Sequence, residues 1–378
     1  MLTIIALFTC LIWLWLTYMH GAFWHCSERL TDAPPPNKWP HVVAIIPARD
    51  EAETIGQIVA AHQNSDYPGE LTLILADDGS TDGTADIAKS NATLDVVSVP
   101  DLPSGWTGKL WAVENALTRA EQIAPDAKYV LLTDADILFA PDTLSRLVAK
   151  AEHEKLALTS LMARLDSRGP WASFLIPAFI YFFQKLYPFP RANNPDDNLA
   201  AAAGGCMLVR KDAIKTIGGM TTIRKALIDD CAFARQIKNL TPSIKIWLGV
   251  ASDEVISLRD NRSLQSIWNM VARTAYAQLS FSPLLLIGTL IGMGFVYLAA
   301  PLILLSVFYH TNFIAIFFSA IACGLMAYTY WPTLRLYGRA PWEAVLLPVS
   351  AGLYAAMTFT SAMRHWRGQG GQWKGRSY

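Results

Sequence analysis

YVLLTDADILF, residues Tyr129 to Phe139, is the stretch around which this chain is organised. Its apolar run, rich in Val and Leu, predicts a buried strand that ends in two carboxylates one residue apart, Asp134 and Asp136. In open α/β sheets, ligands bind outside the carboxyl ends of the strands, where this pair is expected to lie. Two carboxylates at one point can share a divalent cation that also holds phosphate oxygens. Alone, the motif more often marks a strand end and a polar turn, with Asp142 capping the next helix.

Strands alternate with helices on either side of this stretch. We expect strands at 42–46, 71–76, 96–99 and 130–133, helices at about 52–64, 82–90 and 109–123, and further strands at 156–161 and 206–210. This alternation predicts an α/β fold whose mostly parallel sheet is covered by helices on both faces. The strands are apolar without alternation, as expected when both faces are buried.

The composition indicates a membrane protein with a soluble middle. Of the 378 residues 52% are hydrophobic and only 16% charged, against a usual charged share of about 25%, and the deficit is concentrated at the two ends. Lys plus Arg and Asp plus Glu balance at 31 each, so no bulk charge favours nucleic acid as a partner. The five cysteines are widely spread, which predicts reduced thiols and no disulfide framework.

The N-terminal part is expected to be a membrane anchor. Residues 2–19 form an uncharged apolar run without a basic leader or a small-residue cleavage site, so we assign a retained transmembrane anchor to 1–24. The Pro-rich segment 33–41 is too rich in proline for a helix and predicts a stiff linker. The catalytic domain is then expected over 42–262.

The C-terminal part is expected to be membrane-bound. An amphipathic interfacial helix is predicted at 263–281, a transmembrane region of about three segments at 282–363 (284–308, 313–331 and 342–363), and a basic tail at 364–378. Four full crossings would separate the basic tail from the catalytic domain, which conflicts with the positive-inside rule. One C-terminal segment, with the one containing Pro301 as the candidate, is therefore expected to be re-entrant or interfacial.

Two segments inside the catalytic domain are unusual. Residues 171–189 are too apolar for a surface loop and contain Pro177. They predict either a buried helix or, as we prefer, a helix in the membrane interface beside the active site. Residues 190–205 are polar and then rich in small residues, and we expect them to be mobile.

Polar side chains follow the other strands as well. Pro47 is expected to stop the first strand, with Arg49 and Glu51 projecting beyond it, and the second strand ends in Asp77 and Asp78. Each group alone makes ordinary turn and capping chemistry. Together they place acidic residues after three strands at one edge. Such a cluster costs stability unless a cation or hydrogen-bond donors lie within it, and a metal–nucleotide complex supplies both.

The remaining candidates lie outside the strands. Lys109 opens a helix after a glycine-rich turn and can meet a diphosphate. Gly204 and Gly205 precede a strand and leave room for close approach of a ligand. Asp229 and Asp230 begin a predicted helix, where one Asp is enough for capping; the other suits a general base that takes a proton from an acceptor hydroxyl.

These motifs together resemble family 2 glycosyltransferases with a GT-A fold. The resemblance rests on PARDE (47–51), DDGSTDGT (77–84), GWTGK (105–109), TDAD (133–136), GGCMLVR (204–210) and IDD (228–230), and it covers residues 42 to about 240. With the anchor, the apolar C-terminal segments, MVARTAYAQL (270–279) and QWKGRSY (372–378), the whole chain is similar to the bacterial hopene-associated glycosyltransferase subfamily.

The resemblance implies a role for each candidate. Donor-binding residues would be Pro47, Arg49, Glu51, Asp77, Asp78, Lys109 and Asp134. Asp134 and Asp136 would hold Mg²⁺ or Mn²⁺, and Asp230 would be the catalytic base. Gly204, Gly205, Asp229, Trp268 and Arg273 would lie on the acceptor side or have no assigned role. Processive members carry Gln-x-x-Arg-Trp after the base. Here Gln265, Trp268 and Arg273 depart from that register, which favours transfer of a single sugar.

The resulting expectation is a membrane-bound inverting glycosyltransferase that moves one sugar from a nucleotide diphosphate sugar, a UDP-sugar, to a lipid acceptor in hopanoid metabolism. Its place would be the bacterial inner membrane, multi-pass, with the catalytic domain facing the cytoplasm. Alternative acceptors are a polyprenyl phosphate, a ceramide or a diacylglycerol. A membrane protein that binds nucleotide sugars without turnover is the non-enzyme alternative. The sequence predicts no oligomeric state.

Overall fold

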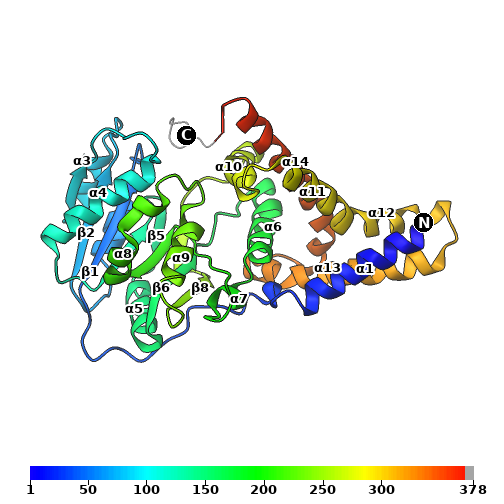
Figure 1. Ribbon diagram of the computed structural model, residues 1–378, viewed down its shortest axis with the longest axis horizontal. Helices are drawn as coiled ribbons and strands as arrows, with labels where there is room; N and C mark the ends of the chain where they lie inside the picture. Colours follow the sequence, from blue (N-terminus) through cyan, green and yellow to red (C-terminus); the bar gives the residue numbers. More distant parts are fainter. Residues whose placement is uncertain (371–378) are drawn as a thin grey trace.

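The computed structural model describes residues 1–370, and these form two parts placed along one long axis, an α/β domain and a set of apolar helices (Figure 1). The last part of the predicted basic tail, including the QWKGRSY segment, lies outside the described residues. The amino terminus lies at the end of the molecule farthest from the α/β domain (Figure 1).

A seven-stranded mixed sheet forms the centre of the α/β domain, in the order β3-β2-β1-β4-β7-β6-β8. β7 runs antiparallel between β4 and β6, and the other neighbouring strands pair in parallel. The strands are β1 Val42–Ala48, β2 Leu71–Asp77, β3 Asp95–Ser98, β4 Tyr129–Thr133, β6 Leu156–Met162, β7 Cys206–Arg210 and β8 Lys245–Val250. The predicted mostly parallel sheet is therefore confirmed, and β1, β4 and β6 are buried along their whole length.

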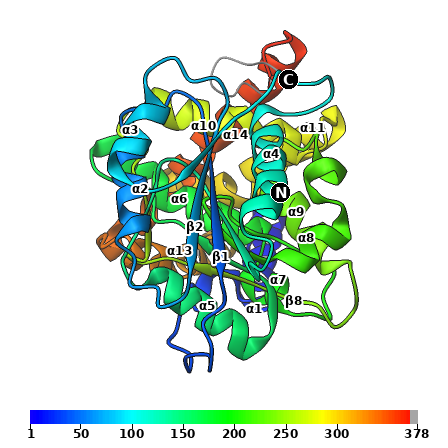
Figure 2. The same cartoon turned by 90° about the vertical axis from the view of Figure 1, so that its left-hand side faces the viewer.

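Helices cover both faces of the sheet (Figure 2). One face packs against α2 Ile55–Gln63, α3 Thr84–Asn91 and α5 Thr143–Glu154, and the other against α4 Gly108–Ile123, α8 Lys211–Ile217 and α9 Asp229–Lys238. Each layer buries apolar side chains of its helices against the strands. This arrangement leaves the edge at the carboxyl ends of the parallel strands for the loops that carry the predicted site.

A second, two-stranded sheet, β5 Ile137–Phe139 with β9 Val255–Ser257, was not predicted. It begins directly after Asp136, whose carbonyl accepts a hydrogen bond from the Leu258 N–H at 2.7 Å. Asp142 occupies the N-cap position of α5, but its side chain makes no capping hydrogen bond and lies 3.7 Å from Arg146 instead.

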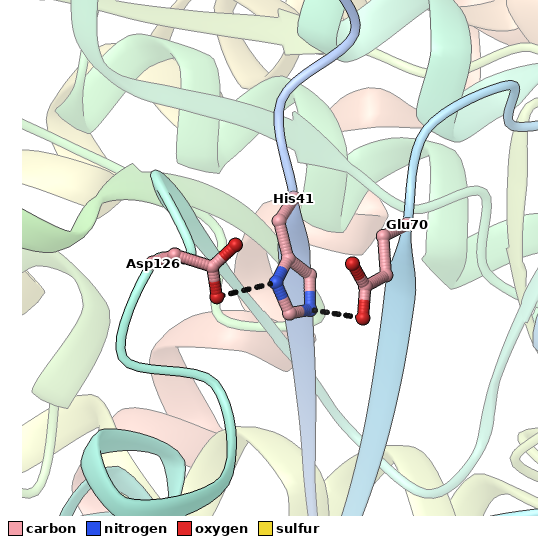
Figure 3. A group of neighbouring side chains, drawn as sticks. All are labelled: His41, Glu70 and Asp126. Atoms are coloured by element: carbon pink, nitrogen blue, oxygen red, sulfur yellow. Dashed lines mark hydrogen bonds and ion pairs between the residues drawn. The ribbon is translucent and has the colours of Figure 1, made fainter.

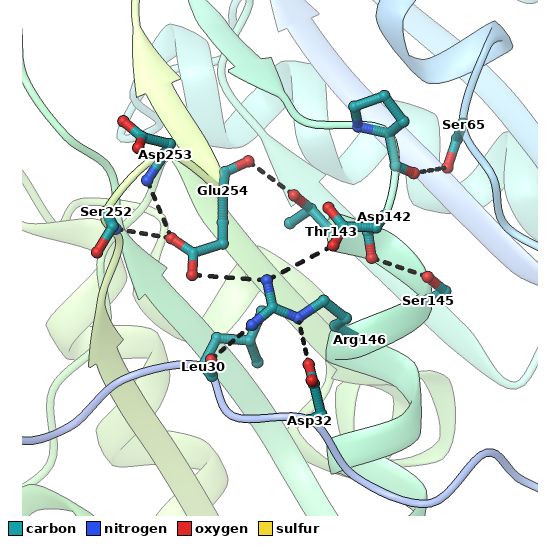
Figure 4. Close-up of polar contacts among 11 residues, drawn as sticks. Leu30, Asp32, Ser65, Asp142, Thr143, Ser145, Arg146, Ser252, Asp253 and Glu254 are labelled. Atoms are coloured by element: carbon teal, nitrogen blue, oxygen red, sulfur yellow. Dashed lines mark hydrogen bonds and ion pairs between the residues drawn. The ribbon is translucent and has the colours of Figure 1, made fainter.

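Arg146 of the α/β domain is one of the residues that hold the chain before β1 (Figure 4). Arg146 on α5 donates to the Asp32 carboxylate at 3.0 Å and to the Leu30 carbonyl at 2.7 Å, and it lies 3.6 Å from Glu254. Leu30 itself is buried. The Pro-rich linker at 33–41 therefore follows a segment already fixed to the domain.

Three helical segments among residues 1–370 are long and apolar enough to cross a membrane: Pro283–Tyr309, Phe313–Leu336 and Pro341–Trp366. The first comprises α11 Pro283–Met293, a π-helical turn at Gly294–Leu298, α12 Ala299–Leu305 and a short 3₁₀ turn; the second is α13; the third is a 3₁₀ turn at Pro341–Leu346 followed by α14 Leu347–Trp366. The predicted anchor contains the shorter α1, Leu2–Tyr18, which packs along α13 (Figure 1). At about 1.5 Å per residue α1 is roughly 25 Å long, slightly shorter than a hydrocarbon core of about 30 Å.

Pro301 does not end the helix that contains it. A proline lacks the N–H that would bond the carbonyl four residues earlier, and its ring crowds that carbonyl. The bonding pattern widens into the π-helical turn Gly294–Leu298 directly before α12, and the helix then continues.

Two helices, α6 Pro170–Leu186 and α10 Leu264–Gln278, pack between the α/β domain and the apolar segments, and α14 packs against both of them. We expected α6 to lie in the membrane interface, but it is mostly buried by neighbouring helices, so the alternative of a buried helix describes its packing. It also continues through Pro177. Segment 190–205, expected to be mobile, contains α7 Phe189–Asn193 at its start and is held by Lys238, whose ammonium donates to the carbonyls of Ala192, Asn194 and Leu199.

Candidate active site

The predicted site residues meet at the carboxyl edge of the parallel strands. They come from the ends of β1 (Pro47, Arg49, Glu51), β2 (Asp77, Asp78) and β4 (Asp134, Asp136), and from the starts of α4 (Lys109) and α9 (Asp229, Asp230). Pro47 does not stop β1 as expected, because the strand continues to Ala48. It lines a small cavity together with Lys109 and Asp134.

The segments after β1 and β2 are bonded to each other by backbone N–H groups that donate to side-chain oxygens. The Asp50 N–H donates to the Ser80 hydroxyl at 3.0 Å, and the Asp50 carboxylate accepts from the Thr81 N–H at 2.8 Å. The Glu51 N–H donates to the Thr84 hydroxyl at 2.9 Å. Asp50 adopts a left-handed conformation with φ of 50°, which Asp tolerates better than most residues. The donor-side loops are therefore held in one arrangement before a ligand binds.

Arg49 covers Asp78. The Asp78 residue is only 2% exposed, its carboxylate lies 3.6 Å from the Arg49 guanidinium, and Arg49 also donates to the Asp78 carbonyl. Asp77 is half-buried, and its carboxylate accepts from the N–H and hydroxyl of Ser80, which shapes the turn after β2. A ligand that reaches the Asp78 carboxylate must therefore also contact Arg49 or displace it.

Lys109 joins the two acidic pairs. Its ammonium lies 2.7 Å from Asp134 and 3.4 Å from Asp229. Burial alone would lower the pKa of Lys109, but the charges of Asp134 and Asp229 outweigh burial and raise that pKa. The segment after β4 and the start of α9, nearly a hundred residues apart in sequence, are thus brought to opposite sides of one cation.

Asp134 and Asp136 fit a divalent cation. Burial first and the neighbouring Asp134 second raise the pKa of Asp136 to about 6, and Glu51 acts in the same direction. Carboxylates crowded in this way are stabilised by a cation among them, and carboxylate oxygens are the ligands that Mg²⁺ and Mn²⁺ prefer. The Asp134 side chain is 36% exposed, so it can also reach a ligand from the open side.

Asp230 is held by two backbone donors. Its two carboxylate oxygens accept from the Gly204 N–H at 3.0 Å and from its neighbour's N–H, that of Cys231, at 2.7 Å. Burial first and Asp229 second nevertheless raise its pKa to about 6. A side chain on Gly204 would lie 3.4 Å from the Lys109 ammonium and 3.6 Å from the Asp230 carboxylate. A glycine here lets the chain pass closely between the two groups.

Gly205 packs against β5 and, unlike Gly204, does not lie beside the charged groups. A Cβ added to Gly205 would meet the side chain of Ile137 at 3.1 Å, which is tight packing against β5. The Gly205 carbonyl accepts from the Thr133 hydroxyl at 2.9 Å and so fixes the start of β7 beside the end of β4. Gly205 therefore belongs to the frame of the site.

Two arginines face the acidic cluster, and sequence reasoning found only one of them. Arg273 on α10 is near enough to Asp229, Asp134 and Asp136 to feel their charge, although burial, followed by Arg259, lowers its pKa. Arg259 was missed, because only the pairing of β9 with β5 brings it beside Asp136, whose pKa it lowers. Trp268, five residues before Arg273 on α10, is half-buried among the apolar helices that separate the two parts of the molecule.

A second group of ligand-type side chains lies at the opposite edge of the sheet (Figure 3). Among residues 1–370, His41, Glu70 and Asp126 are the one set of three whose ligand atoms all lie within 4.8 Å of one another. Asp126 faces Nδ1 of His41 at 3.2 Å, while Nε2 lies 3.8 Å from Glu70 and 2.9 Å from the Thr72 hydroxyl. The carboxylates flank opposite ring nitrogens. This geometry suits hydrogen bonding between strand starts, and it lies far from the predicted metal pair.

Comparison with known proteins identifies the α/β domain. Residues 43–218 match the family model Glycosyl transferase family 2. An N-acetylglucosaminyltransferase of Mesorhizobium japonicum is 28% identical over 156 residues, 38% of this chain and 34% of that protein. A 4,4'-diaponeurosporenoate glycosyltransferase of Staphylococcus aureus is 34% identical over 95 residues, 25% of this chain and 24% of that protein. The matches thus span about a third and a quarter of these relatives' lengths.

A solved structure matches almost the whole chain. The mannosyltransferase PcManGT from Pyrobaculum calidifontis, in complex with GDP-Man and Mn²⁺, covers 97% of this chain and 99% of its own, with a TM-score of 0.57 at 18% identity. At that identity the likeness concerns the fold. Residues 43–218 are therefore a glycosyl transferase family 2 domain, and the α/β domain that contains them has a GT-A fold.

Proposed function

We propose that this enzyme transfers one sugar from a nucleotide diphosphate sugar, a UDP-sugar, to the hydroxyl of a lipid dissolved in the membrane, with inversion at the anomeric carbon. The observation that carries the proposal is the position of Lys109. Its ammonium lies 2.7 Å from Asp134, at the donor side, and 3.4 Å from Asp229, next to Asp230. A buried carboxylate that can act as a base therefore lies beside the carboxylates suited to a metal–diphosphate.

The donor side consists of the rigid pair of loops and the end of β4. Glu51, Asp77 and Asp78 supply acceptors for ribose and base donors, while Arg49 and Lys109 supply positive charge. Asp134 and Asp136 would hold Mg²⁺ or Mn²⁺, which neutralises charge on the leaving diphosphate. Arg259 and Arg273 face the same cluster and can meet diphosphate oxygens with their guanidinium groups.

Asp230 is the proposed general base. The acceptor oxygen attacks the anomeric carbon and forms the new C–O bond, the bond from that carbon to the diphosphate oxygen breaks with its electron pair, and the acceptor proton passes to Asp230. A base whose pKa lies near 6 is ionised at neutral pH and still takes up a proton readily. Its two backbone hydrogen bonds keep the carboxylate in place while it waits for the acceptor.

A lipid acceptor is supported by the apolar half of the molecule. Three segments among the described residues are long and apolar enough to cross a membrane, and α10, which follows the catalytic domain, carries Arg273 to the acidic cluster. A relative is named for the lipid-like acceptor 4,4'-diaponeurosporenoate. A hopanoid is the specific acceptor we propose. It rests on the resemblance of the whole chain to the hopene-associated subfamily.

We also place the catalytic domain on the cytoplasmic side of a bacterial inner membrane. Arg335 in the last turn of α13 and Arg339 just after it lie at the end nearest the domain, whereas residues 306–312, before the start of the same helix, contain no Lys or Arg. Positive charge collects on the cytoplasmic side of membrane proteins. Nucleotide sugars would then reach the site directly from the cytoplasm.

The proposal is tested by following labelled sugar into lipid. The full-length enzyme in nanodiscs is given labelled UDP-glucose, UDP-N-acetylglucosamine or GDP-mannose together with bacterial lipid extract that contains hopanoids. Asp230→Asn is expected to lower turnover by about 10²–10⁴-fold, whereas Asp66→Asn, exposed at the opposite edge, leaves it unchanged. Turnover of Asp230→Asn close to wild type would refute the base assignment.

The acceptor class is separated by the same variant. A polyprenyl phosphate is already ionised and needs no strong base, so an enzyme acting on it would tolerate Asp230→Asn; a hopanoid, ceramide or diacylglycerol hydroxyl would not. Mass spectrometry of the labelled lipid then names the acceptor. The metal pair is tested with Asp136→Ala, which is expected to weaken Mn²⁺-dependent binding of the nucleotide; unchanged binding would assign the cation to other residues.

A further inference from the structure

We propose that the segment Pro341–Trp366 does not cross the membrane, although it is long and apolar enough to do so. It docks on the lipid surface, on the side where the catalytic domain lies. The inference does not depend on the acceptor or on any catalytic role. It rests on what the two ends of the segment contact and on which of its side chains are exposed.

The start of the segment lies against the catalytic domain. Tyr337, four residues before it, has a hydroxyl that accepts from the Leu165 N–H at 3.4 Å. The guanidinium of Arg164 lies over the Tyr337 ring at 6.0 Å. Arg164 and Leu165 lie just after the end of strand β6, and the Arg164 N–H donates to the Val255 carbonyl of β9. The chain that leaves α13 therefore returns to the α/β domain before the segment begins.

The end of the segment lies against the same side of the molecule. Arg364 donates to the Asn269 side chain of α10 at 2.8 Å. His365 stacks on Phe281 at 4.4 Å, and Trp366 packs against Tyr276 at 5.8 Å. α10 is the helix that brings Arg273 to the catalytic carboxylates, so it cannot lie across the bilayer from them.

The middle of the segment follows the layer of helices next to the domain. The Tyr354 hydroxyl donates to the Leu175 carbonyl of α6 at 2.9 Å, and its ring lies 5.0 Å from Phe182. The Tyr276 N–H of α10 donates to the Ser361 hydroxyl at 3.0 Å. Figure 1 shows α14 at a steep angle to α13 and α1, which lie side by side and point away from the domain. A crossing helix must instead carry its ends to opposite sides of a core about 30 Å thick.

The outer face of the segment is apolar and suits lipid. Its exposed large side chains are Trp342 (67%), Val345 (67%), Val349 (56%), Phe359 (47%) and Trp366 (53%). They recur at helical spacing and form one stripe, while the opposite face packs on α6 and α10. Tryptophan stands at both ends of the stripe, and this residue favours the water–lipid boundary. The stripe continues the exposed apolar surface of α11 and α13, so its partner is the same membrane.

This placement removes the topological conflict found in the sequence. If α1, Pro283–Tyr309 and α13 cross the membrane and Pro341–Trp366 does not, the amino terminus and the catalytic domain lie on opposite sides. The chain after α14 then lies on the same side as the catalytic domain. Arg364 and Arg367 then join Arg339 on the domain side, as the positive-inside rule requires. In this arrangement the segment that does not cross contains α14, whereas Pro301 lies in Pro283–Tyr309, which crosses the membrane.

Labelling of single-cysteine variants shows on which side of the membrane the segment Pro341–Trp366 ends. The full-length protein is placed in sealed vesicles with Lys89→Cys in the catalytic domain, Thr311→Cys between α12 and α13, or Gln369→Cys after α14, each exposed. A membrane-impermeant maleimide is expected to label Gln369→Cys and Lys89→Cys from the same side and Thr311→Cys from the other. Labelling of Gln369→Cys together with Thr311→Cys would overturn the proposal. Unsubstituted protein, whose cysteines are buried or half-buried, gives the background.

Labels at two glycine positions measure how deeply α14 and α13 lie in the bilayer. A side chain added at Gly352 in α14 or at Gly324 in the middle of α13 would meet no atom within 4 Å, so both accept a cysteine with a fluorescent label. We expect quenchers near the lipid headgroup to act most strongly on the Gly352→Cys label and quenchers deep in the acyl chains to act most strongly on the Gly324→Cys label. Equal, deep quenching of both labels would show that α14 crosses.

Discussion

At the scale of single residues, the charge balance of the site depends on Lys109. It lies between Asp134 and Asp229, and it is also among the groups that lower the pKa of Asp230 and of Asp136. Without it four carboxylates would face one another with only the two arginines nearby. The Lys109 ammonium therefore favours the ionised forms of both the proposed base, Asp230, and the proposed metal ligand Asp136.

The pH dependence follows from Asp230. Its pKa of about 6 lies above the ordinary carboxyl value of 3.8, so below about pH 6 the base is protonated and activity is lost. We expect kcat/KM, measured at saturating Mn²⁺, to fall on the acid side with a limb near pH 6. Lys109→Met removes a charge that lowers this pKa and should move the limb to higher pH, whereas Lys89→Met on exposed α3 should not. A limb that stays in place in Lys109→Met would assign it to another group.

The same raised pKa has a cost in stability. The folded protein binds the Asp230 proton more tightly than the unfolded chain, so the free energy of unfolding decreases as pH rises from about 4 to about 6 and is unaffected by this group above that range. A ligand that brings a cation to the carboxylates is expected to increase the free energy of unfolding at neutral pH.

Binding of a metal–nucleotide should therefore stabilise the fold. With Mn²⁺ and UDP each at about 100 times the dissociation constant, we expect a gain of about 2.7 kcal/mol in the free energy of unfolding, seen as a rise in Tm. Asp136→Ala should abolish the rise, and Glu70→Ala, in the group at the opposite edge, should leave it intact. A rise that depends on Glu70 would move the metal site to His41, Glu70 and Asp126.

At the scale of elements, the donor side is one unit made of two loops. Thr84 is fully buried, and its hydroxyl accepts from the Glu51 N–H of the neighbouring loop and donates to Asp82. Thr84→Val keeps the shape but removes both hydrogen bonds of the hydroxyl, at a cost of about 0.5–1.5 kcal/mol for each bond. We expect a lower Tm and a higher KM for the nucleotide sugar with kcat little changed. Thr93→Val, on the exposed loop before β3, is the control, and equal KM values would show that the loops act independently.

The elements that the sequence predicted well are those whose signal is local. β1, β2 and β4 are continuous apolar runs, and the helices between them follow at the usual spacing, so their order and the edge that carries the carboxylates could be predicted. β5 and β9 are three residues long and show no periodicity, and they pair across more than a hundred residues. An apolar run also does not reveal its direction, which is why the antiparallel course of β7 was not foreseen.

The site residues that follow a local sequence signal could also be predicted, whereas those that depend on tertiary packing could not. Carboxylates at strand ends can be placed at one edge from sequence, and Asp134, Asp136 and Asp230 do meet there. The cover of Arg49 over Asp78 and the approach of Arg259 to Asp136 depend on tertiary packing, for which the sequence has no local pattern. Their functional roles stay predictions until the variants are measured.

At the scale of the whole molecule, the catalytic domain and the membrane part share one core. α6 packs between them, and its buried residues contact α13 and α14 as well as the domain. The Tyr187 hydroxyl, directly after α6, donates to Gln278 of α10 at 2.9 Å, and Tyr187 is also close to Cys231, the neighbour of Asp230. The two parts are therefore not independent bodies on a flexible tether.

We expect the π-helical turn at Gly294–Leu298 to make turnover sensitive to the thickness of the bilayer. Its Tyr297 hydroxyl accepts from the Lys185 ammonium of α6 at 2.9 Å, and α6 leads to Tyr187 beside the base. A membrane of different thickness tilts or stretches a spanning helix, and a π turn is where a helix yields most easily. We expect turnover to vary with acyl-chain length in nanodiscs, and Lys185→Met to flatten that variation. If the turnover of the wild-type enzyme is equal in short-chain and long-chain lipids, hydrophobic mismatch has no effect on the reaction at Asp230.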